Sequence, residues 1–173
     1  MDRRTFAKTI AAGALGLGAA PVLAQGMRHG GMAMGPAERT HVLETLGIGS
    51  VSLLSSRMAL SKARRPLVRQ FADFEAEEST TVAQILGEIS GMTPPPPIGA
   101  DRALLARLQA ANGAMFERDY LAGQLNGHQR LLRVQERYLS QGRNQHHRHI
   151  AMLARGRIRE HIRELQLLQN MRG

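Results

Sequence analysis

The chain has 173 residues, no cysteine and a formal net charge of +9 at neutral pH. The absence of cysteine excludes disulfide bonds, thiolate metal sites, cysteine nucleophiles and a lipid attached through cysteine. Aromatic residues make up only 3% of the chain and tryptophan is absent, so leucine, alanine, isoleucine and methionine must fill the core.

The first 24 residues have the layout of a bacterial export signal. Arg3-Arg4 stand near its start, a weakly apolar run covers residues 9–20, and the cleavage-like Val22-Leu23-Ala24 follows. The apolar run is shorter than the roughly 20 residues that a membrane-spanning helix needs. We therefore expect residues 1–24 to be a cleaved signal peptide of the twin-arginine type. The mature protein is then expected in the periplasm, where it can associate peripherally with the envelope.

Residues 25–36 are rich in glycine and methionine and are predicted to be a flexible leader. A first helix is expected from Pro36, a favourable first-turn residue, to about Ser61. Gly47 and Gly49 lie inside it, and each lowers the stability of the helix by about 1 kcal/mol relative to alanine. Close packing against a neighbour is expected to compensate for these glycines. After a basic connection at residues 62–65, a second helix has the best amphipathic pattern of the chain. Its apolar stripe is predicted to be Leu67, Phe71, Phe74, Val82, Ile85 and Ile89.

Gly91 and the proline run 94–97 end that helix, and the prolines predict an extended surface connector. Asp101 is expected to cap a short helix that ends near residue 112, and two long helices are expected over about 114–140 and 144–170. Turn-bounded runs of β-branched residues, the signal of strands, are missing. The prediction is therefore an all-α protein, with a ferritin-like up-down four-helix bundle over residues 37–173. Its Pro-rich crossover and short extra helix lie between helices two and three.

Several short motifs resemble a known family. Phe116-Glu117-Arg118-Asp119-Tyr120-Leu121, followed by His128-Gln129, is similar to the F-D-x-x-Y-[ML] … H-x-K core of a bacterial domain-of-unknown-function family. Further matches are Val68 to Ala72, the Pro-rich crossover and Arg159-Glu160-His161. The resemblance covers about residues 38–168 and implies an exported, ferritin-like protein, of the kind labelled outer membrane protein. The family brings no established activity. Its usual Asp-His pairs are replaced here by Glu78-Ser79 and Gly127-His128.

Polar residues on the apolar stripes are the candidate metal ligands. The sequence lacks the pair of Glu-x-x-His motifs that a di-iron centre needs, which argues against such a centre. The candidates, one on each long helix, are Glu44, Glu78, His128 and His161. Glu78 is expected at the depth of His128, and Glu44 at that of His161. Two interpretations stay open: a mononuclear metal or ligand site, or buried Glu–His hydrogen bonds that fix the helix register.

Two further segments of the chain contain histidines that could bind metal. Thioether and imidazole groups suit copper(I), and the leader offers Met27, His29, Met32 and Met34 as a candidate copper site. The alternative interpretation is that the leader is unstructured and binds no ligand. The tract His146-His147-Arg148-His149 opens the last helix among arginines, so it is expected to form a solvated, pH-responsive surface.

The excess positive charge lies in the second half of the chain, where residues 101–173 hold thirteen arginines against six acidic residues. Four-residue spacing predicts arginine stripes on the last two helices. They comprise Arg130, Arg133, Arg137, Arg155, Arg159 and Arg163. For an exported protein the matching partners are anionic phospholipids, envelope polysaccharide or acidic proteins rather than nucleic acid. The alternative is a solvated basic face without a partner.

No catalytic motif is found: the sequence lacks a Gly-x-Ser-x-Gly elbow, a phosphate loop and a His-Glu-x-x-His pair. We therefore expect a non-enzymatic periplasmic protein that binds something or associates with the envelope, in a stress-related role and without a cofactor. The alternative is a periplasmic protein that binds or handles copper or iron.

Overall fold

Five helices account for most of residues 34–171, the part of the chain that the structure, a computed structural model, describes. The helices are α1 (Pro36–Lys62), α2 (Pro66–Ser90), α3 (Gly99–Ala110), α4 (Gly113–Gln141) and α5 (Gln145–Asn170). No strand occurs within these described residues, so the predicted all-α class is confirmed. The predicted signal peptide and most of the predicted leader lie outside the described residues.

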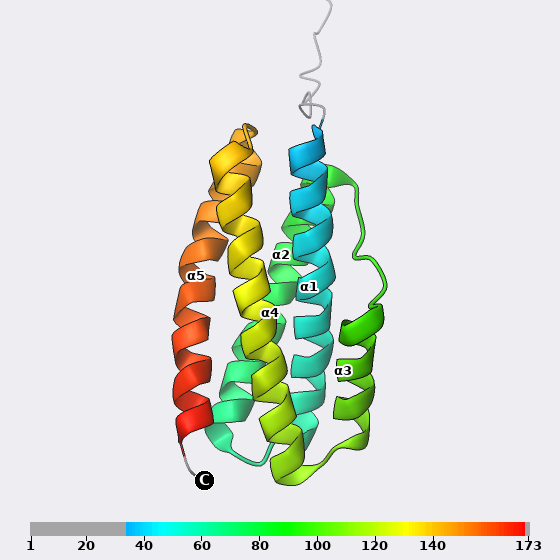
Figure 1. Cartoon of the computed structure of the whole chain (residues 1–173), viewed down its shortest axis with the longest axis vertical. Helices are drawn as coiled ribbons and strands as arrows, with labels where there is room; N and C mark the ends of the chain where they lie inside the picture. The colour runs from blue at the N-terminus through cyan, green and yellow to red at the C-terminus, as the bar shows by residue number, and fades with distance from the viewer. Residues whose placement is uncertain (1–33, 172–173) are drawn as a thin grey trace, which may run out of the picture. The chain divides into compact units, whose positions relative to one another are not determined.

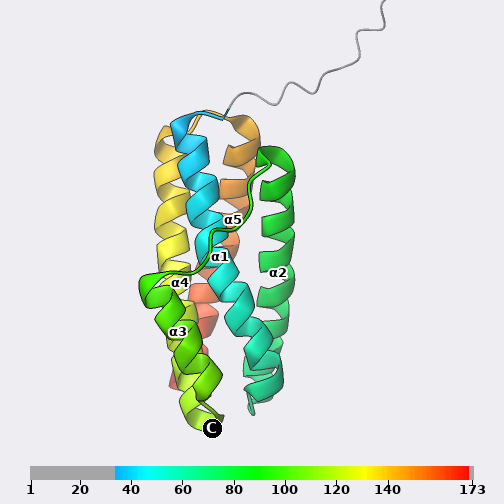
Figure 2. The ribbon, with the colours of Figure 1, turned by 90° about the vertical axis from the view of Figure 1, so that its right-hand side faces the viewer.

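The four long helices run side by side, with α1 and α5 pointing one way and α2 and α4 pointing the other (Figure 1). Helix α1 packs against α2 and α4, and α4 also packs against α5. The short helix α3 lies on the outside of α1 and α4, and the extended segment 91–98 passes along α1 to reach it (Figure 2). This long connection between α2 and α4 lets those two helices run in the same direction.

Local sequence signals explain where the helices begin and end. Pro36 and Pro66 occupy first-turn positions, where the missing backbone N–H of proline has no helical partner to lose. Gly91 ends α2 with a φ of 69°, a left-handed conformation that glycine adopts without steric cost. The side chain of Asn144 caps α5 by accepting hydrogen bonds from the backbone N–H groups of His146 and His147.

The predicted cap on α3 was wrong. Ile98 occupies the N-cap position, and Asp101 lies in the first turn, where its carboxylate accepts two hydrogen bonds from Arg130 at 2.6 and 3.0 Å. At the other end of α3, the Lys62 ammonium donates to the backbone carbonyls of Leu108, Gln109 and Ala111. Side chains from α4 and α1 therefore hold the two ends of α3.

The two glycines inside α1 have different surroundings. A Cβ atom on Gly47 would lie 3.2 Å from the ring of Pro95, so this glycine allows the Pro-rich connector to pack closely. A Cβ atom on Gly49 would meet nothing within 4 Å. The expected compensation by close packing holds for Gly47 and is wrong for Gly49.

The predicted apolar stripe on α2 was largely wrong. Leu67, Phe74, Ile85 and Ile89 are exposed, while the buried positions are Val68, Phe71, Ala72, Glu75 and Leu86. Both sets follow helical spacing, and the neighbouring helices select the second. The inward face of α2 therefore presents Glu75 to the interior.

Among the described helices, none is long and apolar enough to cross a membrane.

Candidate metal centre

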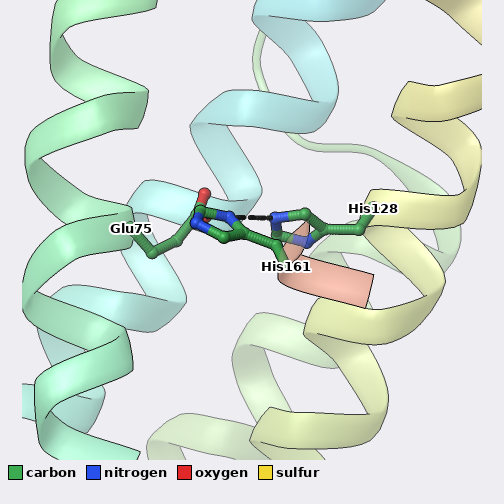
Figure 3. Close-up of side chains that lie close together, drawn as sticks. All are labelled: Glu75, His128 and His161. Atoms are coloured by element: carbon green, nitrogen blue, oxygen red, sulfur yellow. Dashed lines mark hydrogen bonds and ion pairs between the residues drawn. The ribbon is translucent and has the colours of Figure 1, made fainter. Parts of the chain in front are cut away.

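Three buried side chains from three helices meet in the interior. Glu75 of α2, His128 of α4 and His161 of α5 are each no more than 3% exposed. Oε2 of Glu75 lies 3.1 Å from Nε2 of His128 and 3.0 Å from Nδ1 of His161. The two ring nitrogens are themselves 3.1 Å apart (Figure 3). The three atoms form a nearly equilateral triangle of potential metal ligands.

Each of the two histidines has a second polar neighbour beyond the triangle. Nδ1 of His128 lies 2.8 Å from the backbone carbonyl oxygen of Gln124. Because that oxygen can only accept, Nδ1 carries a proton and Nε2 is the ring atom left to face Glu75. On His161 the outer nitrogen, Nε2, lies 3.6 Å from Oε2 of Glu78. Such outer partners orient histidine rings at metal sites.

The carboxylate of Glu75 is held in the same way. Its Oε1 atom accepts hydrogen bonds from the hydroxyl groups of Ser52 at 2.6 Å and Ser79 at 2.7 Å. These bonds fix the carboxylate and leave Oε2 directed at the two histidines. All three side chains of the triangle are therefore positioned by groups outside it.

Electrostatics make Glu75 and His128 an ion pair when no metal is present. Burial alone would raise the pKa of Glu75, but hydrogen bonds from His128, His161 and Ser52 and the charge of His128 outweigh burial and lower this pKa. Burial alone would lower the pKa of His128, but the hydrogen bond and the charge of Glu75 raise it. A buried carboxylate therefore lies against a buried imidazolium.

A small cavity adjoins the triangle. It has a volume of about 50 Å³ and is lined by Glu75, Glu78 and His128 together with apolar side chains such as Val82 and Ile158. One water needs roughly 10–15 Å³ of such space, so the cavity has room for a few water-sized ligands. A metal ion held by the three side chains would have open coordination positions on this side.

The structure brings together two of the four residues predicted on the stripes. His128 and His161 meet, whereas the prediction placed them at different depths. Glu78 is half-buried at the edge of the site and accepts a hydrogen bond from Arg157 at 3.0 Å. Glu44 is a surface residue that pairs with Arg137, so its predicted place as a ligand beside His161 was wrong.

Glu75 was missed because the predicted stripe on α2 pointed the wrong way. Three acidic residues stand close together at 75, 77 and 78, and the stripe through Phe74 favoured Glu78. The alternative stripe through Val68, Phe71 and Ala72 continues to Glu75 at helical spacing. That second pattern was the signal that could have found it.

The remaining histidine and methionine candidates are separate from this site. Met34 is partly buried against an apolar cluster that includes Val42 and Ile150. The other leader candidates, Met27, His29 and Met32, lie outside the described residues. The expected solvated histidine surface was partly wrong: His146 and His149 are exposed, but His147 is buried. His147 faces inward because the first turn of α5 packs against Tyr138 of α4.

The six candidate arginines do not form a uniformly free basic surface. Arg130, Arg137 and Arg159 each pair with a carboxylate of the described chain. Their carboxylate partners are Asp101, Glu44 and Glu136. Within residues 34–171, the ion pairs include none to Arg133, Arg155 or Arg163. Half of the predicted set is thus partly neutralised.

The Phe116–Leu121 motif has a structural role. The rings of Phe116 and Tyr120 stack in the core with their centres 6.0 Å apart. Glu117 accepts hydrogen bonds from the backbone N–H groups of Arg64 and Arg65 and from the Arg65 guanidinium. The motif therefore fastens α4 to the connection between α1 and α2. Within residues 34–171, no hydrogen bond or ion pair joins the motif to the triangle.

Comparison with known proteins gives one family. Neither the curated proteins nor the solved structures contain a match to this chain. A family model described as Domain of unknown function (DUF4142) matches residues 27–168, which is most of the chain. The motif around Phe116, His128 and the Glu160-His161 pair all fall within that range. The chain therefore belongs to the DUF4142 family.

Proposed function

We propose that this protein binds one divalent first-row transition-metal ion through Glu75, His128 and His161. Two imidazoles and one carboxylate on one side of an ion, with open positions opposite, form the donor set that non-haem iron(II) sites use. Iron(II) is therefore the ion that we favour. The observation that carries the proposal is the triangle of 3.0–3.1 Å between the three ligand atoms.

The size of this triangle distinguishes between coordination geometries. Ligand atoms about 2.1 Å from a metal are about 3.0 Å apart when they share an octahedral face, and about 3.4 Å apart in a tetrahedron. The distances among Glu75, His128 and His161 match the octahedral face. The adjoining cavity supplies room for the water ligands that would complete the octahedron.

Charge balance also favours a metal ion at this position. One carboxylate and two neutral imidazoles leave a net charge of about +1 around a divalent ion, and buried charge is costly unless it is compensated. Glu78, 3.6 Å from the outer nitrogen of His161, brings a second negative charge close to the ligands. Neutralisation of the ion therefore needs no group from outside the described chain.

We place this metal-binding protein in the periplasm, because its first 24 residues have the features of a twin-arginine signal. The parallel helices α2 and α4, joined by a long connection, and the opposite direction of α1 and α5 support a ferritin-like four-helix bundle as its layout. Binding or handling of the ion is the proposed role, since no catalytic motif occurs in the sequence. The arginine-rich second half is proposed to favour contact with anionic envelope components.

Metal titration of the full chain tests the proposal. Metal-free protein is titrated under anaerobic conditions with iron(II), and with cobalt(II) as a coloured substitute, and the bound ion is quantified per chain. We expect one ion per wild-type chain and its loss in Glu75→Gln and His128→Ala. His149→Ala and Glu44→Gln are matched controls, because they remove an exposed histidine and an exposed carboxylate. The site would be refuted if the wild-type chain bound no ion, or if Glu75→Gln and His128→Ala bound the ion as the controls do.

A further inference from the structure

A second pair of buried histidines lies near the beginnings of α1 and α5, at the upper end in Figure 1. His41 is 1% exposed and His147 is 2% exposed. Their ring centres are 5.9 Å apart and their planes are inclined by 72°. The ring of His41 also stacks on that of Tyr138 at 4.3 Å, which fixes its position. Two imidazoles are thus held close together, away from water.

Hydrogen bonds define which nitrogen of His41 is available. Its Nε2 atom lies 2.7 Å from Oε1 of Gln135, and the amide nitrogen of Gln135 donates to the hydroxyl oxygen of Thr45. An amide oxygen only accepts, so Nε2 of His41 must carry the proton. In the neutral ring, Nδ1 of His41 therefore holds a bare lone pair.

That lone pair has no hydrogen-bond partner within residues 34–171, and neither does Nδ1 of His147. A buried polar atom without a partner is energetically costly and calls for an explanation. The two atoms that lack a partner belong to neighbouring rings. A ligand that accepts electron pairs from both nitrogens would satisfy both at once.

Both rings are suited to donate lone pairs at neutral pH. Burial lowers the pKa of His41, and burial likewise lowers that of His147, although the charge of Glu38 opposes both shifts. Arg137 and His146 act in the same direction as burial. The two imidazoles are therefore neutral, which is the form that binds metal.

We propose that Nδ1 of His41 and Nδ1 of His147 bind one copper(I) ion between them. An ion about 2 Å from each of two nitrogens places the ring centres about 6 Å apart when both rings point at it. The 5.9 Å separation of the two rings fits this arrangement. Gln135 fills the role of the outer partner that fixes the tautomer of a metal-binding histidine.

The charge of the surroundings selects a monovalent ion. Glu38, the nearest buried carboxylate, is occupied by the Tyr138 hydroxyl and by backbone N–H groups of the loop before α5. Among the described residues, the only cluster of three or more ionisable metal ligands is the one at Glu75. Because the cost of desolvating an ion grows with the square of its charge, a singly charged ion costs about a quarter as much as a divalent one. Copper also accepts imidazole ligands readily.

This site is independent of the iron site proposed above. It uses other residues and a different ion, and it lies closer to the starts of α1 and α5. Val42, next to His41 in the sequence, and Ile150, one turn after His147, belong to one apolar cluster. The partly buried thioether of Met34 packs on the same cluster, so this end of the protein is also rich in soft, apolar groups.

Competition for copper(I) against a coloured chelator, bicinchoninate, tests the proposal on the full chain without oxygen. We expect one copper(I) per chain, bound at least about 100-fold more weakly in His41→Phe and His147→Ala, and about 10–100-fold more weakly in Gln135→Leu. His146→Ala and His149→Ala are the matched controls, because they replace exposed histidines near His147 in α5. Unchanged affinity in both His41→Phe and His147→Ala would overturn the site.

Two further measurements keep the test decisive if the variants fold poorly. X-ray absorption of the copper-loaded wild-type chain should show two nitrogen ligands and no sulfur, whereas a sulfur-containing shell would assign the copper to methionines and overturn the proposal. His128→Ala should retain copper(I), and His147→Ala should retain iron(II) or cobalt(II). Loss of copper(I) in His128→Ala would show that the copper occupies the Glu75 site, which also overturns the second site.

Discussion

Nε2 of His128 and Nδ1 of His161 lie 3.1 Å apart in the interior, each directed at the same oxygen of Glu75. His128 already donates a proton from Nδ1 to the backbone of Gln124, so a second proton on Nε2 makes its ring a cation. That cation forms the ion pair with Glu75 in the metal-free protein. A metal ion bound at the triangle must therefore displace the proton on Nε2.

Metal binding should release this proton, which gives the first prediction. Because Glu75 raises the pKa of His128 above its usual value of 6.5, the metal-free ring is protonated up to that raised pKa. The apparent affinity for cobalt(II) should then fall about tenfold for each pH unit below the raised pKa and level off above it. Titration calorimetry in two buffers of different protonation enthalpy counts the protons released. An affinity that does not change with pH across this range would contradict the prediction.

Removing the carboxylate of Glu75 should strongly destabilise the metal-free protein. Glu75→Ala leaves the buried imidazole of His128 without its counter-charge, and breaking a buried pair in this way costs about 3–5 kcal/mol. Glu44→Gln breaks an exposed pair with Arg137 and should cost no more than about 1 kcal/mol. Urea unfolding followed by circular dichroism measures both free energies of unfolding. Equal losses in the two variants would show that the triangle contributes no more than a surface ion pair.

The fastening of α4 by Glu117 predicts a pH-dependent stability. Burial alone would raise the pKa of Glu117, but hydrogen bonds from Arg65 and Arg64 outweigh burial and lower it below 4.5. The lowered pKa means that this carboxylate stabilises the fold above about pH 4.5 and loses that contribution as the pH falls through the folded-state pKa. Glu117→Gln should cost about 1.5–3 kcal/mol at neutral pH.

The difference between wild type and Glu117→Gln should shrink in acid. Free energies of unfolding measured from neutral pH down to below the lowered pKa of Glu117 would show the two curves converging. Glu88→Gln is a suitable control, because Glu88 is exposed and, among residues 34–171, accepts a hydrogen bond only from Gln84 of its own helix. A gap between wild type and Glu117→Gln that stays constant in acid would show that the side chain matters for packing and not for charge.

Helix positions could be predicted from the sequence because local signals set them. Pro36, Pro66, Gly91 and the Asn144 cap mark ends through backbone geometry and hydrogen bonds within a few residues. The inward face of α2 could not be predicted, since Leu67 and Phe74 form one apolar stripe while Val68 and Phe71 form another. Only packing against α1 and the other helices decides between these two stripes.

Local patterns in the sequence indicated some residues of the two sites and not others. His128 and His161 were found because each lies among apolar residues at helical spacing, and both positions are buried. Whether Glu75 is buried depends on which face of α2 points inward, and the sequence alone does not decide this. His41 becomes a buried residue through Tyr138 and Gln135, which lie more than ninety positions away in the sequence. No local pattern carries information about contacts at that separation.

The last prediction concerns the outer carboxylate of the iron site. Glu78 and Glu160 both pair with Arg157, at 3.0 and 2.9 Å, but Glu78 also lies 3.6 Å from the outer nitrogen of His161. Loss of such an outer partner typically weakens metal affinity 10–100-fold, so Glu78→Gln should weaken cobalt(II) binding by about that factor. Glu160→Gln removes a more exposed carboxylate from the same guanidinium and should leave the affinity unchanged. Equal weakening in both variants would attribute the effect to Arg157 and general surface charge, whereas weakening confined to Glu78→Gln identifies a carboxylate that orients His161.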